Sequence, residues 1–210
     1  MPITVRHVDP ALLVLEKPAG LLSVPGRGPD KQDCLSARVQ QQYPDAQIVH
    51  RLDMATSGLM LMARGAQALS ILNRAFANRQ IDKRYQALVC GRPACDDSLW
   101  QEIDLPIAVD WPNRPLRVIT ADGKPSLTRW RLVDTAHPAI TRIDLEPVTG
   151  RSHQLRVHLQ AIGHPIVGDP LYGRDDEAGR ADRLMLHATH IRLHHPLSGE
   201  LLAFSSEPAF

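Results

Sequence analysis

Apolar residues in this chain of 210 residues occur in short runs, and turn-forming residues separate one run from the next. The longest runs, at residues 11–15 and 59–63, are far shorter than the roughly 18 apolar residues that a membrane-spanning helix needs. Short apolar runs between turn signals are typical of strands buried in a sheet. The pattern therefore predicts a globular, sheet-rich protein without a membrane-spanning helix.

The spacing of the apolar residues predicts where strands and helices lie. We expect strands in six segments, at residues 12–15, 59–63, 84–90, 127–133, 143–148 and 184–193. Helical spacing over residues 66–79 and 153–162 predicts two helices, the second with Ser152 as its N-cap and Gly163 just after its end. No repeat or Gly/Ser linker divides the chain. We therefore expect one α+β domain over residues 1–210, with a mixed, mainly antiparallel β-sheet flanked by helices and long loops.

Composition excludes several classes of protein. With 43% hydrophobic and 22% charged residues, the chain is far from the profile of a disordered protein. Its N-terminal segment lacks the cationic head and apolar stretch of a secretory signal, which predicts a cytoplasmic location. Three cysteines, without a C-x-x-C pair, and ten histidines, without Cys or Glu at ligand spacing, favour neither disulfides nor a metal site. The cysteines are Cys34, Cys90 and Cys95.

The net charge gives only a weak indication of a partner. A formal charge of +1 and a pI near 7.9 lie below the pI of about 9 that is usual for a nucleic-acid-binding domain. A local concentration of positive charge nevertheless serves a phosphate-bearing ligand, whereas each residue taken singly is an ordinary solvated side chain. The basic residues that flank the motifs described below are Lys17, Arg51, Lys83, Arg84, Arg114, Arg117, Arg151 and Arg156.

The most informative segment is HRLDMATSGL at residues 50–59, which places Asp53 in a polar loop that leads directly into an apolar strand. Taken alone, an Asp followed by Thr, Ser and Gly is more often a turn residue than a nucleophile. The segment, however, closely resembles the catalytic motif of the RluA-type pseudouridine synthases, in which this Asp is the essential nucleophile. The resemblance implies that Asp53 is catalytic.

The resemblance extends over nearly the whole chain, in the order and spacing of the family. It includes EKPAGLLSVPG at 16–26, KRYQALV at 83–89, TGRSHQLRVHL at 149–159 and GHPIVGD at 163–169. The segment DWPNRP at 110–115 resembles the compact RluA branch rather than larger relatives with an N-terminal S4 RNA-binding domain, for which we expect no room before Lys17. That branch modifies a hairpin in 23S ribosomal RNA and the anticodon stem-loop of certain tRNAs. The resemblance therefore implies RNA as the partner and a single catalytic domain.

The implied reaction is an isomerisation, and it needs few parts. The N-glycosidic bond of uridine breaks, the uracil turns, a bond forms from C5 to the sugar C1′, and the C5 proton leaves. No redox step, phosphate transfer or water attack is involved, so we expect no metal or nucleotide cofactor. An ionised carboxylate attacks C1′ or C6, or removes the C2′ proton, and the resemblance does not choose among these roles for Asp53.

Two further catalytic residues are implied by the same motifs. Arg156 matches the second Arg of the RxHQLR motif, and a guanidinium beside Asp53 would favour the ionised carboxylate. From the residues alone, Arg156 is equally compatible with the surface of an amphipathic helix. Tyr85 matches the active-site Tyr of the family, where it stacks on the uracil or brings its phenol oxygen near C5 or the ribose. A Tyr in an alternating strand is otherwise a core residue.

Six residues are candidates for contacts to RNA. The target base must leave its stack, and the resemblance gives Arg51 the place of the side chain that fills the gap. The polar loop with Trp111, Asn113 and Arg114 suits stacking on loop nucleotides, although Trp111 packing into the domain is about as good an interpretation. Arg151 and Gln154 are expected to contact RNA or the backbone of their own loop.

Two other classes of function are compatible with parts of the sequence. A nucleoside or glycoside hydrolase would use Asp53 with a second carboxylate, and no paired acid stands out within the motifs. An RNA-binding or ribosome-assembly module would bind RNA without modifying it, which the complete set of Asp53, Tyr85 and Arg156 argues against. No large apolar stripe is evident, so we expect a monomer with no obligate protein partner.

Overall fold

The computed structural model describes residues 3–94, 99–137, 139–174, 176 and 179–210. It forms two compact units, and the chain passes between them three times. The first unit contains Met1–Lys83 and His187–Ala209, and the second contains Arg84–Leu186 together with Phe210. Within the described residues, no helix is long and apolar enough to cross a membrane.

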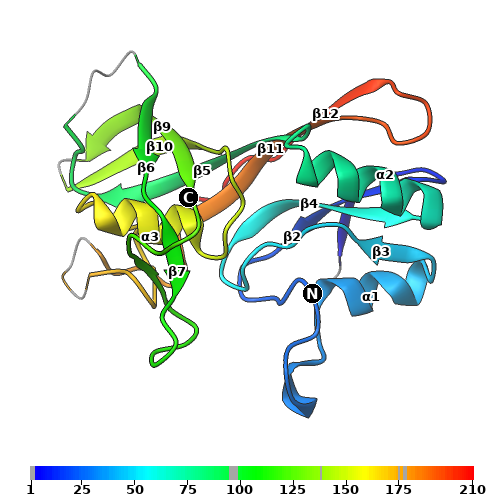
Figure 1. The fold of residues 1–210 in the computed structure, drawn as a ribbon, viewed down its shortest axis with the longest axis horizontal. Coiled ribbons are helices and arrows are strands. Elements are labelled where there is room, and N and C mark those ends of the chain that lie inside the picture. Colours follow the sequence, from blue (N-terminus) through cyan, green and yellow to red (C-terminus); the bar gives the residue numbers. More distant parts are fainter. Residues whose placement is uncertain (1–2, 95–98, 138, 175, 177–178) are drawn as a thin grey trace. The chain divides into compact units, whose positions relative to one another are not determined.

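The first unit is built on a sheet (Figure 1), and two of its strands are buried almost throughout. Its order is β1 (Thr4–Val8), β2 (Leu12–Lys17), β4 (Ser57–Arg64) and β11 (Leu186–His194). In addition, β3 (Ala46–Ile48) pairs with β4, and β12 (Leu201–Ser205) pairs with β11. The β4–β11 pair is parallel, whereas the pairs β1–β2, β2–β4, β3–β4 and β11–β12 are antiparallel. Burial on both faces explains why β2 and β4 are continuous apolar runs rather than alternating ones.

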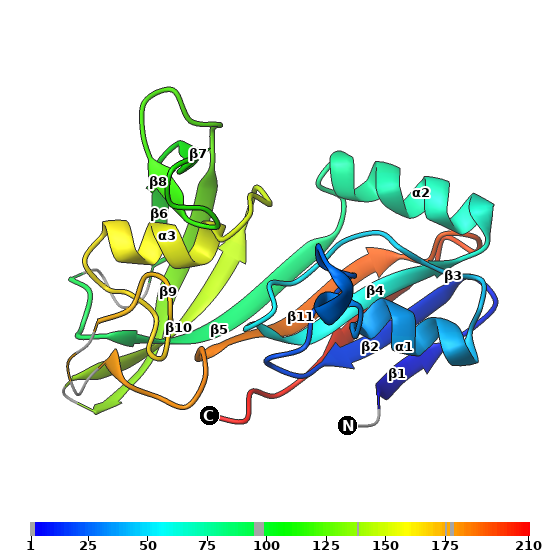
Figure 2. The ribbon, with the colours of Figure 1, turned by 90° about the horizontal axis from the view of Figure 1, so that it is seen from below.

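Helices complete the core of the first unit. Helix α2 (Ala66–Ala77) lies alongside β4 in both ribbon views (Figures 1 and 2), and its buried Ala68 and Leu72 join the same apolar cluster as Leu59 and Leu61 of that strand. A short 3-10 helix (Pro29–Lys31) precedes helix α1 (Leu35–Gln42), whose neighbour is β3. Gly65 before α2 has a φ of 77°, which lets the chain turn sharply from β4 into the helix.

The second unit has an antiparallel sheet in the order β5, β10, β9, β6. These strands span Asp82–Cys90, Ile140–Pro147, Leu127–His137 and Gln101–Asp104, respectively. A separate hairpin pairs β7 (Ile107–Val109) with β8 (Arg117–Ile119). Helix α3 (Gln154–Ala161) contacts β8, β9 and β10, and its Val157 packs with Ile107 and Tyr172. This packing of α3 places Gln154, at its N-terminal end, beside β9.

The predicted fold class is confirmed, because the described chain has a mixed, mostly antiparallel arrangement of strands and three α-helices. All six predicted strands exist, with bounds that differ by a few residues at their ends, and both predicted helices exist as α2 and α3. Gly163 follows α3 with a φ of 84°, as expected for the residue after a helix end. The predicted N-cap at Ser152 is wrong: the cap position is His153, in the left-handed region with a φ of 58° and without a capping side-chain bond. The single domain over residues 1–210 stays a prediction.

Candidate functional site

The loop that carries Asp53 connects β3 to β4 and is held from one side by residues 17–23. Ser23 Oγ accepts the Leu52 N–H at 3.1 Å and donates to the Leu52 carbonyl at 2.7 Å. The Met54 carbonyl accepts the Gly20 N–H at 2.9 Å. Both neighbours of Asp53 in the chain are thus fixed to the same segment, which restricts the backbone that aims its carboxylate.

Lys17 strengthens this attachment from a fully buried position, with 0% of its surface exposed. Its ammonium donates to the carbonyls of Pro18 at 2.9 Å, Leu21 at 2.8 Å and Met54 at 3.0 Å. A buried cation is costly unless it is hydrogen-bonded, and three carbonyl acceptors match the three donors of an ammonium group. Lys17 therefore shapes the loop behind Asp53.

His50 holds the other end of the loop. Its Nε2 accepts the N–H of Leu61 in β4 at 2.8 Å, and its ring stacks on Phe76 with the centroids 4.7 Å apart. A ring nitrogen that accepts a backbone N–H carries no proton, so the imidazole is neutral. Burial, and secondarily the charge of Lys83, lower the pKa of His50 to about 3. The loop is consequently fixed to β4 by a group that stays neutral at physiological pH.

Asp53 itself is only partly buried, whereas its neighbours Leu52 and Thr56 are buried. Its carbonyl accepts the Thr56 N–H at 3.1 Å, which closes the loop as a turn. Immediately afterwards, Ser57 and Gly58 pair with His187 and Ala188 in β11. Gly58 has a φ of 111°, and a Cβ there would lie 2.4 Å from the Ala188 carbonyl oxygen, so only glycine allows this close approach.

Arg156 lies on α3 and is held by a carboxylate that the sequence analysis did not assign, Asp169. The guanidinium donates from Nε to Oδ2 at 2.8 Å and from Nη2 to Oδ1 at 2.6 Å. The two side chains are 3% and 0% exposed, so the pair is a buried, bidentate one. Asp169 Oδ1 also accepts the N–H groups of Leu171 and Tyr172, at 2.9 and 3.1 Å. The pairing of Arg156 with Asp53 stays a prediction, and the Gly-Asp end of the GHPIVGD motif was the available signal for Asp169.

Tyr172 forms the second side of the Arg156 environment. The Arg156 guanidinium lies over the Tyr172 ring, 5.2 Å from its centroid. The phenol oxygen accepts the Arg117 N–H at 2.8 Å and is hydrogen-bonded to His153 Nδ1 at 2.8 Å. Burial raises the pKa of Tyr172, so the phenol stays protonated. Asp169 therefore fixes the edge of the Arg156 guanidinium, and the Tyr172 ring covers its face, before any ligand binds.

The remaining predicted side chains differ from one another in exposure. Tyr85 lies in β5 opposite Leu145 and is partly buried, and Arg51 is exposed. Trp111 is 67% exposed, so the alternative in which it packs the domain is wrong. The Arg114 guanidinium lies 5.0 Å from the Trp111 ring centroid, and Asn113 Nδ2 donates to Asp110. The loop thus presents a paired indole and guanidinium to solvent.

Gln154 is buried and uses its whole amide within the protein. Its Oε1 accepts from the Thr149 hydroxyl at 2.7 Å and the Arg151 N–H at 2.9 Å. Its Nε2 donates to the Leu127 carbonyl at 2.9 Å and Thr128 Oγ1 at 3.0 Å. Of the two roles that we expected for Gln154, the structure gives it the contact to its own loop backbone. Arg151 is exposed, and its guanidinium contacts the Pro125 carbonyl.

The described residues contain no group of three or more His, Cys, Asp or Glu side chains that could hold a metal ion. His158, one of the residues considered for a metal, is buried between Thr128 Oγ1 and the Leu105 carbonyl, both 2.9 Å from its ring nitrogens. Burial lowers the pKa of His158. Cys95 lies outside the described residues.

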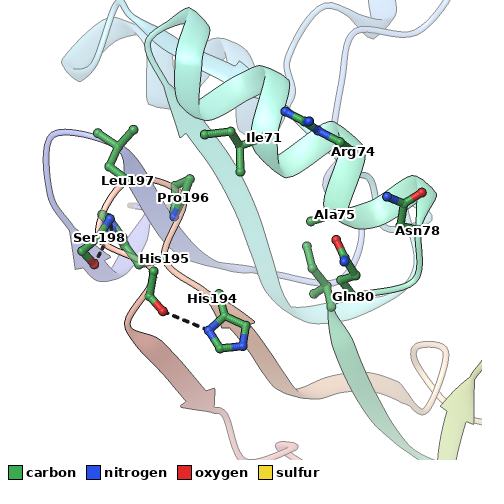
Figure 3. Close-up of a pocket in the computed structure, with 12 residues that line it drawn as sticks. Ile71, Arg74, Ala75, Asn78, Gln80, His194, His195, Pro196, Leu197 and Ser198 are labelled. Atoms are coloured by element: carbon green, nitrogen blue, oxygen red, sulfur yellow. Dashed lines mark hydrogen bonds between the residues drawn. The ribbon is translucent and has the colours of Figure 1, made fainter.

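A groove in the first unit contains none of the predicted site residues (Figure 3). The last two turns of α2 and the turn between β11 and β12 line it, and His194 Nδ1 is bonded there to the Gly199 carbonyl at 3.0 Å. Although Arg74 contributes a positive charge, the carbonyl end of a helix disfavours an anion. The groove is therefore a poor site for a phosphate group.

Comparisons with known proteins agree with the motifs. The model of a family described as RNA pseudouridylate synthase matches residues 11–161. A protein of Escherichia coli (strain K12) named dual-specificity RNA pseudouridine synthase RluA is 42% identical over 209 residues, 99% of this chain and 94% of that protein. Proteins with the same name are 44% identical in Yersinia pestis, over 98% of this chain and 99% of that protein, and 48% identical in Vibrio vulnificus (strain CMCP6), over 90% and 77%.

Two solved structures resemble this one over all or nearly all of its length. Human RNA pseudouridylate synthase domain containing 1 matches with a TM-score of 0.81 and 28% identity, over 100% of this chain and 84% of that chain. Human RNA pseudouridylate synthase domain containing 4 matches with a TM-score of 0.77 and 22% identity, over 97% and 88%, which shows the shared fold.

Proposed function

This chain belongs to the RNA pseudouridylate synthase family and isomerises uridine in RNA to pseudouridine, and we propose that Asp53 is the group that begins the reaction. The observation that supports this role is the attachment of the Asp53 loop. Leu52 and Met54 are bonded to residues 17–23, while Asp53 between them stays partly exposed. A carboxylate on a fixed backbone is preorganised for one attack geometry.

The reaction is balanced without a co-reactant. The N1–C1′ bond breaks, the C5–C1′ bond forms, and the C5 proton is finally replaced by a proton at N1. Asp53 supplies the carboxylate of the proposed reaction, and Arg156 supplies a positive charge. Because Asp169 and Tyr172 already hold Arg156, little conformational entropy is lost when its charge is used. Tyr85 stacks on the uracil as the base turns.

RNA is bound through exposed stacking and charged groups. Trp111 and Arg114 form a solvent-facing pair, and stacking of a base on an aromatic ring contributes about 1–3 kcal/mol. Arg51 directly precedes the buried Leu52 of the Asp53 loop and is exposed, which suits a guanidinium that fills the place of the extruded base. Arg151 is exposed at the start of α3 and contributes a phosphate contact.

We infer two classes of substrate, a hairpin of 23S ribosomal RNA and a tRNA anticodon stem-loop. The support is the resemblance to the RluA branch and the name dual-specificity RNA pseudouridine synthase carried by relatives that are 42–48% identical. The protein acts as a monomer in the cytoplasm, where both RNAs are available.

The test is release of tritium from C5-labelled uridine in each of the two RNAs. Asp53→Asn should abolish release from both while RNA binding is retained. The matched control is Asp33→Asn, an exposed carboxylate paired with Arg38, which should leave the rate unchanged. Free uracil in the products would indicate a hydrolase, and bound RNA without release by the wild-type chain would indicate a binding module. Either result would contradict the proposed function.

A further inference from the structure

A chain of hydrogen bonds crosses the interior of the first unit from Ser57 to Glu16. Ser57 Oγ lies 2.8 Å from His187 Nδ1, and His187 Nε2 lies 2.9 Å from Ser206 Oγ. Ser206 Oγ donates to Glu16 Oε1 at 2.9 Å, and the other Glu16 oxygen accepts from Arg6 Nε at 2.7 Å. Ser57 and His187 are each 3% exposed, and Ser206 is 5% exposed. The series of hydrogen bonds therefore runs from a buried hydroxyl, that of Ser57, to a charged and partly exposed carboxylate, that of Glu16.

In this series of hydrogen bonds, each group donates its proton to the next group on the way to Glu16. Because Ser206 gives its only hydroxyl proton to the carboxylate, its oxygen accepts from His187, and the ring carries its proton on Nε2. His187 Nδ1 is then an acceptor, so the Ser57 hydroxyl donates to it. Aligned donors of this kind polarise one another in a low-dielectric interior, which strengthens each bond.

The buried end of the chain coincides with the end of the Asp53 loop. Ser57 stands four residues after Asp53 and is paired in register with His187, and the next pair, Gly58 and Ala188, leaves no room for a side chain. The chain of bonds joins residues of β4, β11, the segment after β12, β2 and β1, which are neighbours in the sheet order. It fixes the exit of the loop, just as Ser23 and Lys17 fix its middle.

We propose that His187 is a positioning residue for the reaction, which holds the exit of the Asp53 loop through Ser57 and is itself oriented by Ser206 and Glu16. This proposal rests on the proposed role of Asp53. His187 touches no reacting atom; it acts through the loop backbone. Misplacement of a reacting group by about 1 Å costs up to a hundredfold in rate, so loss of this link should lower kcat and leave the KM for RNA unchanged.

Two substitutions separate this role from a purely structural one. The amide oxygen of an asparagine lies near the Nδ1 position of a histidine, so His187→Asn keeps an acceptor for Ser57 and loses the donor to Ser206. The amide nitrogen of a glutamine lies near the Nε2 position, so His187→Gln keeps the donor to Ser206 and loses the acceptor for Ser57. Each variant removes one of the bonds that His187 makes to the Ser57 and Ser206 hydroxyls, so their melting temperatures should fall by similar amounts.

The expected kcat values differ. His187→Asn should stay within about threefold of the wild type, and His187→Gln should fall by about tenfold or more, with unchanged KM. Equal kcat values for the two variants, at equal stability, would show that His187 has only a structural role. In the wild type, ¹⁵N NMR of the ring should place the proton on Nε2, and a proton on Nδ1 would overturn the assigned direction of the chain.

A second pair of variants makes smaller changes and covers the case in which the His187 variants do not fold. Ser57→Ala and Ser206→Ala should each lower kcat, and the double variant should match the slower single variant because both act through one chain. Multiplied effects would contradict a single chain. Ser126→Ala is the control, since Ser126 is equally buried but bonds to the Lys124 carbonyl in the second unit, and its kcat should equal that of the wild type.

Failure of this proposal is distinguishable from failure of the proposed function. An inactive Asp53→Asn variant together with equal His187→Asn and His187→Gln rates would overturn the positioning role alone. A fully active Asp53→Asn variant would overturn both, because no loop would then need positioning.

Discussion

Asp169→Asn removes the charge that faces Arg156 while keeping nearly the same shape. The oxygen of an asparagine still accepts the N–H groups of Leu171 and Tyr172, so the change isolates the ion pair. Arg156 is 3% exposed, and removing one partner of a buried pair leaves an uncompensated charge. Such a loss costs about 3–5 kcal/mol, a large part of the stability of an ordinary domain.

Urea unfolding followed by tryptophan fluorescence measures this cost in the correct part of the molecule. The three tryptophans, Trp100, Trp111 and Trp130, all belong to the second unit, which also contains Asp169. The control is Glu102→Gln, which breaks the pair with Arg129 in the same unit, where both side chains are about half exposed. An exposed pair contributes at most about 1 kcal/mol.

A third variant distinguishes stability from function. Combining Asp169→Asn with Arg156→Met leaves no buried charge and keeps the acceptor for the Leu171 and Tyr172 N–H groups, so much of the lost stability should return. Activity should not return, because the proposed catalytic cation, Arg156, is gone. A loss of less than 1 kcal/mol for Asp169→Asn, equal to that of the control, would refute the reasoning that the pair is buried and essential to the α3 region.

Three further predictions follow from contacts in the described residues. Lys17→Met leaves the Pro18, Leu21 and Met54 carbonyls without their shared donor and should destabilise the first unit by at least about 2 kcal/mol, measured by amide hydrogen exchange. Trp111→Ala should raise the KM for RNA by about tenfold and leave the melting temperature unchanged, whereas Trp111→Phe should retain most of the affinity; equal KM values for both would contradict a stacking role. Because the folded-state pKa of His50 is lowered to about 3, the unfolded chain binds the extra proton between about pH 6.5 and pH 3, and stability should fall as the pH falls through that window. His50→Gln should reduce this slope by up to about 1.4 kcal/mol per pH unit, and an unchanged slope in urea titrations at several pH values would assign the acid sensitivity to other groups.

Strands whose burial follows a local pattern were predictable from the sequence. β2 and β4 are buried almost throughout, so each is a short apolar run that only a sheet interior accommodates. Helix α1 was missed because it ends in three glutamines and buries only Leu35, Ser36 and Val39. Its N-cap is Cys34, whose sulfur accepts the Ala37 N–H, and cysteine is not a usual signal for the start of a helix.

In the candidate site too, residues in a contiguous motif were predictable, whereas partners far apart in the sequence were not. Asp53 was identified from a contiguous motif, whereas Asp169 was missed because its bidentate bond to Arg156 joins residues that are 13 positions apart. The ten histidines were considered only as metal ligands, and nothing in the sequence singles out His187, whose bonds reach Ser57, 130 positions away. Partners of this kind are set by sheet order, which spacing in the sequence does not reveal.

The division of the chain between the two units has a consequence for biosynthesis. The first unit needs Met1–Lys83 and His187–Ala209, whereas the second needs little beyond the segment between them. During translation the ribosome therefore releases everything required for the second unit while β4 still lacks β11. His187 and Ser206, which fix the exit of the Asp53 loop, emerge later still. The segments that form the Arg156–Asp169 pair consequently emerge before the Asp53 loop is secured, and a ribosome that stalls before residue 187 carries an incomplete enzyme.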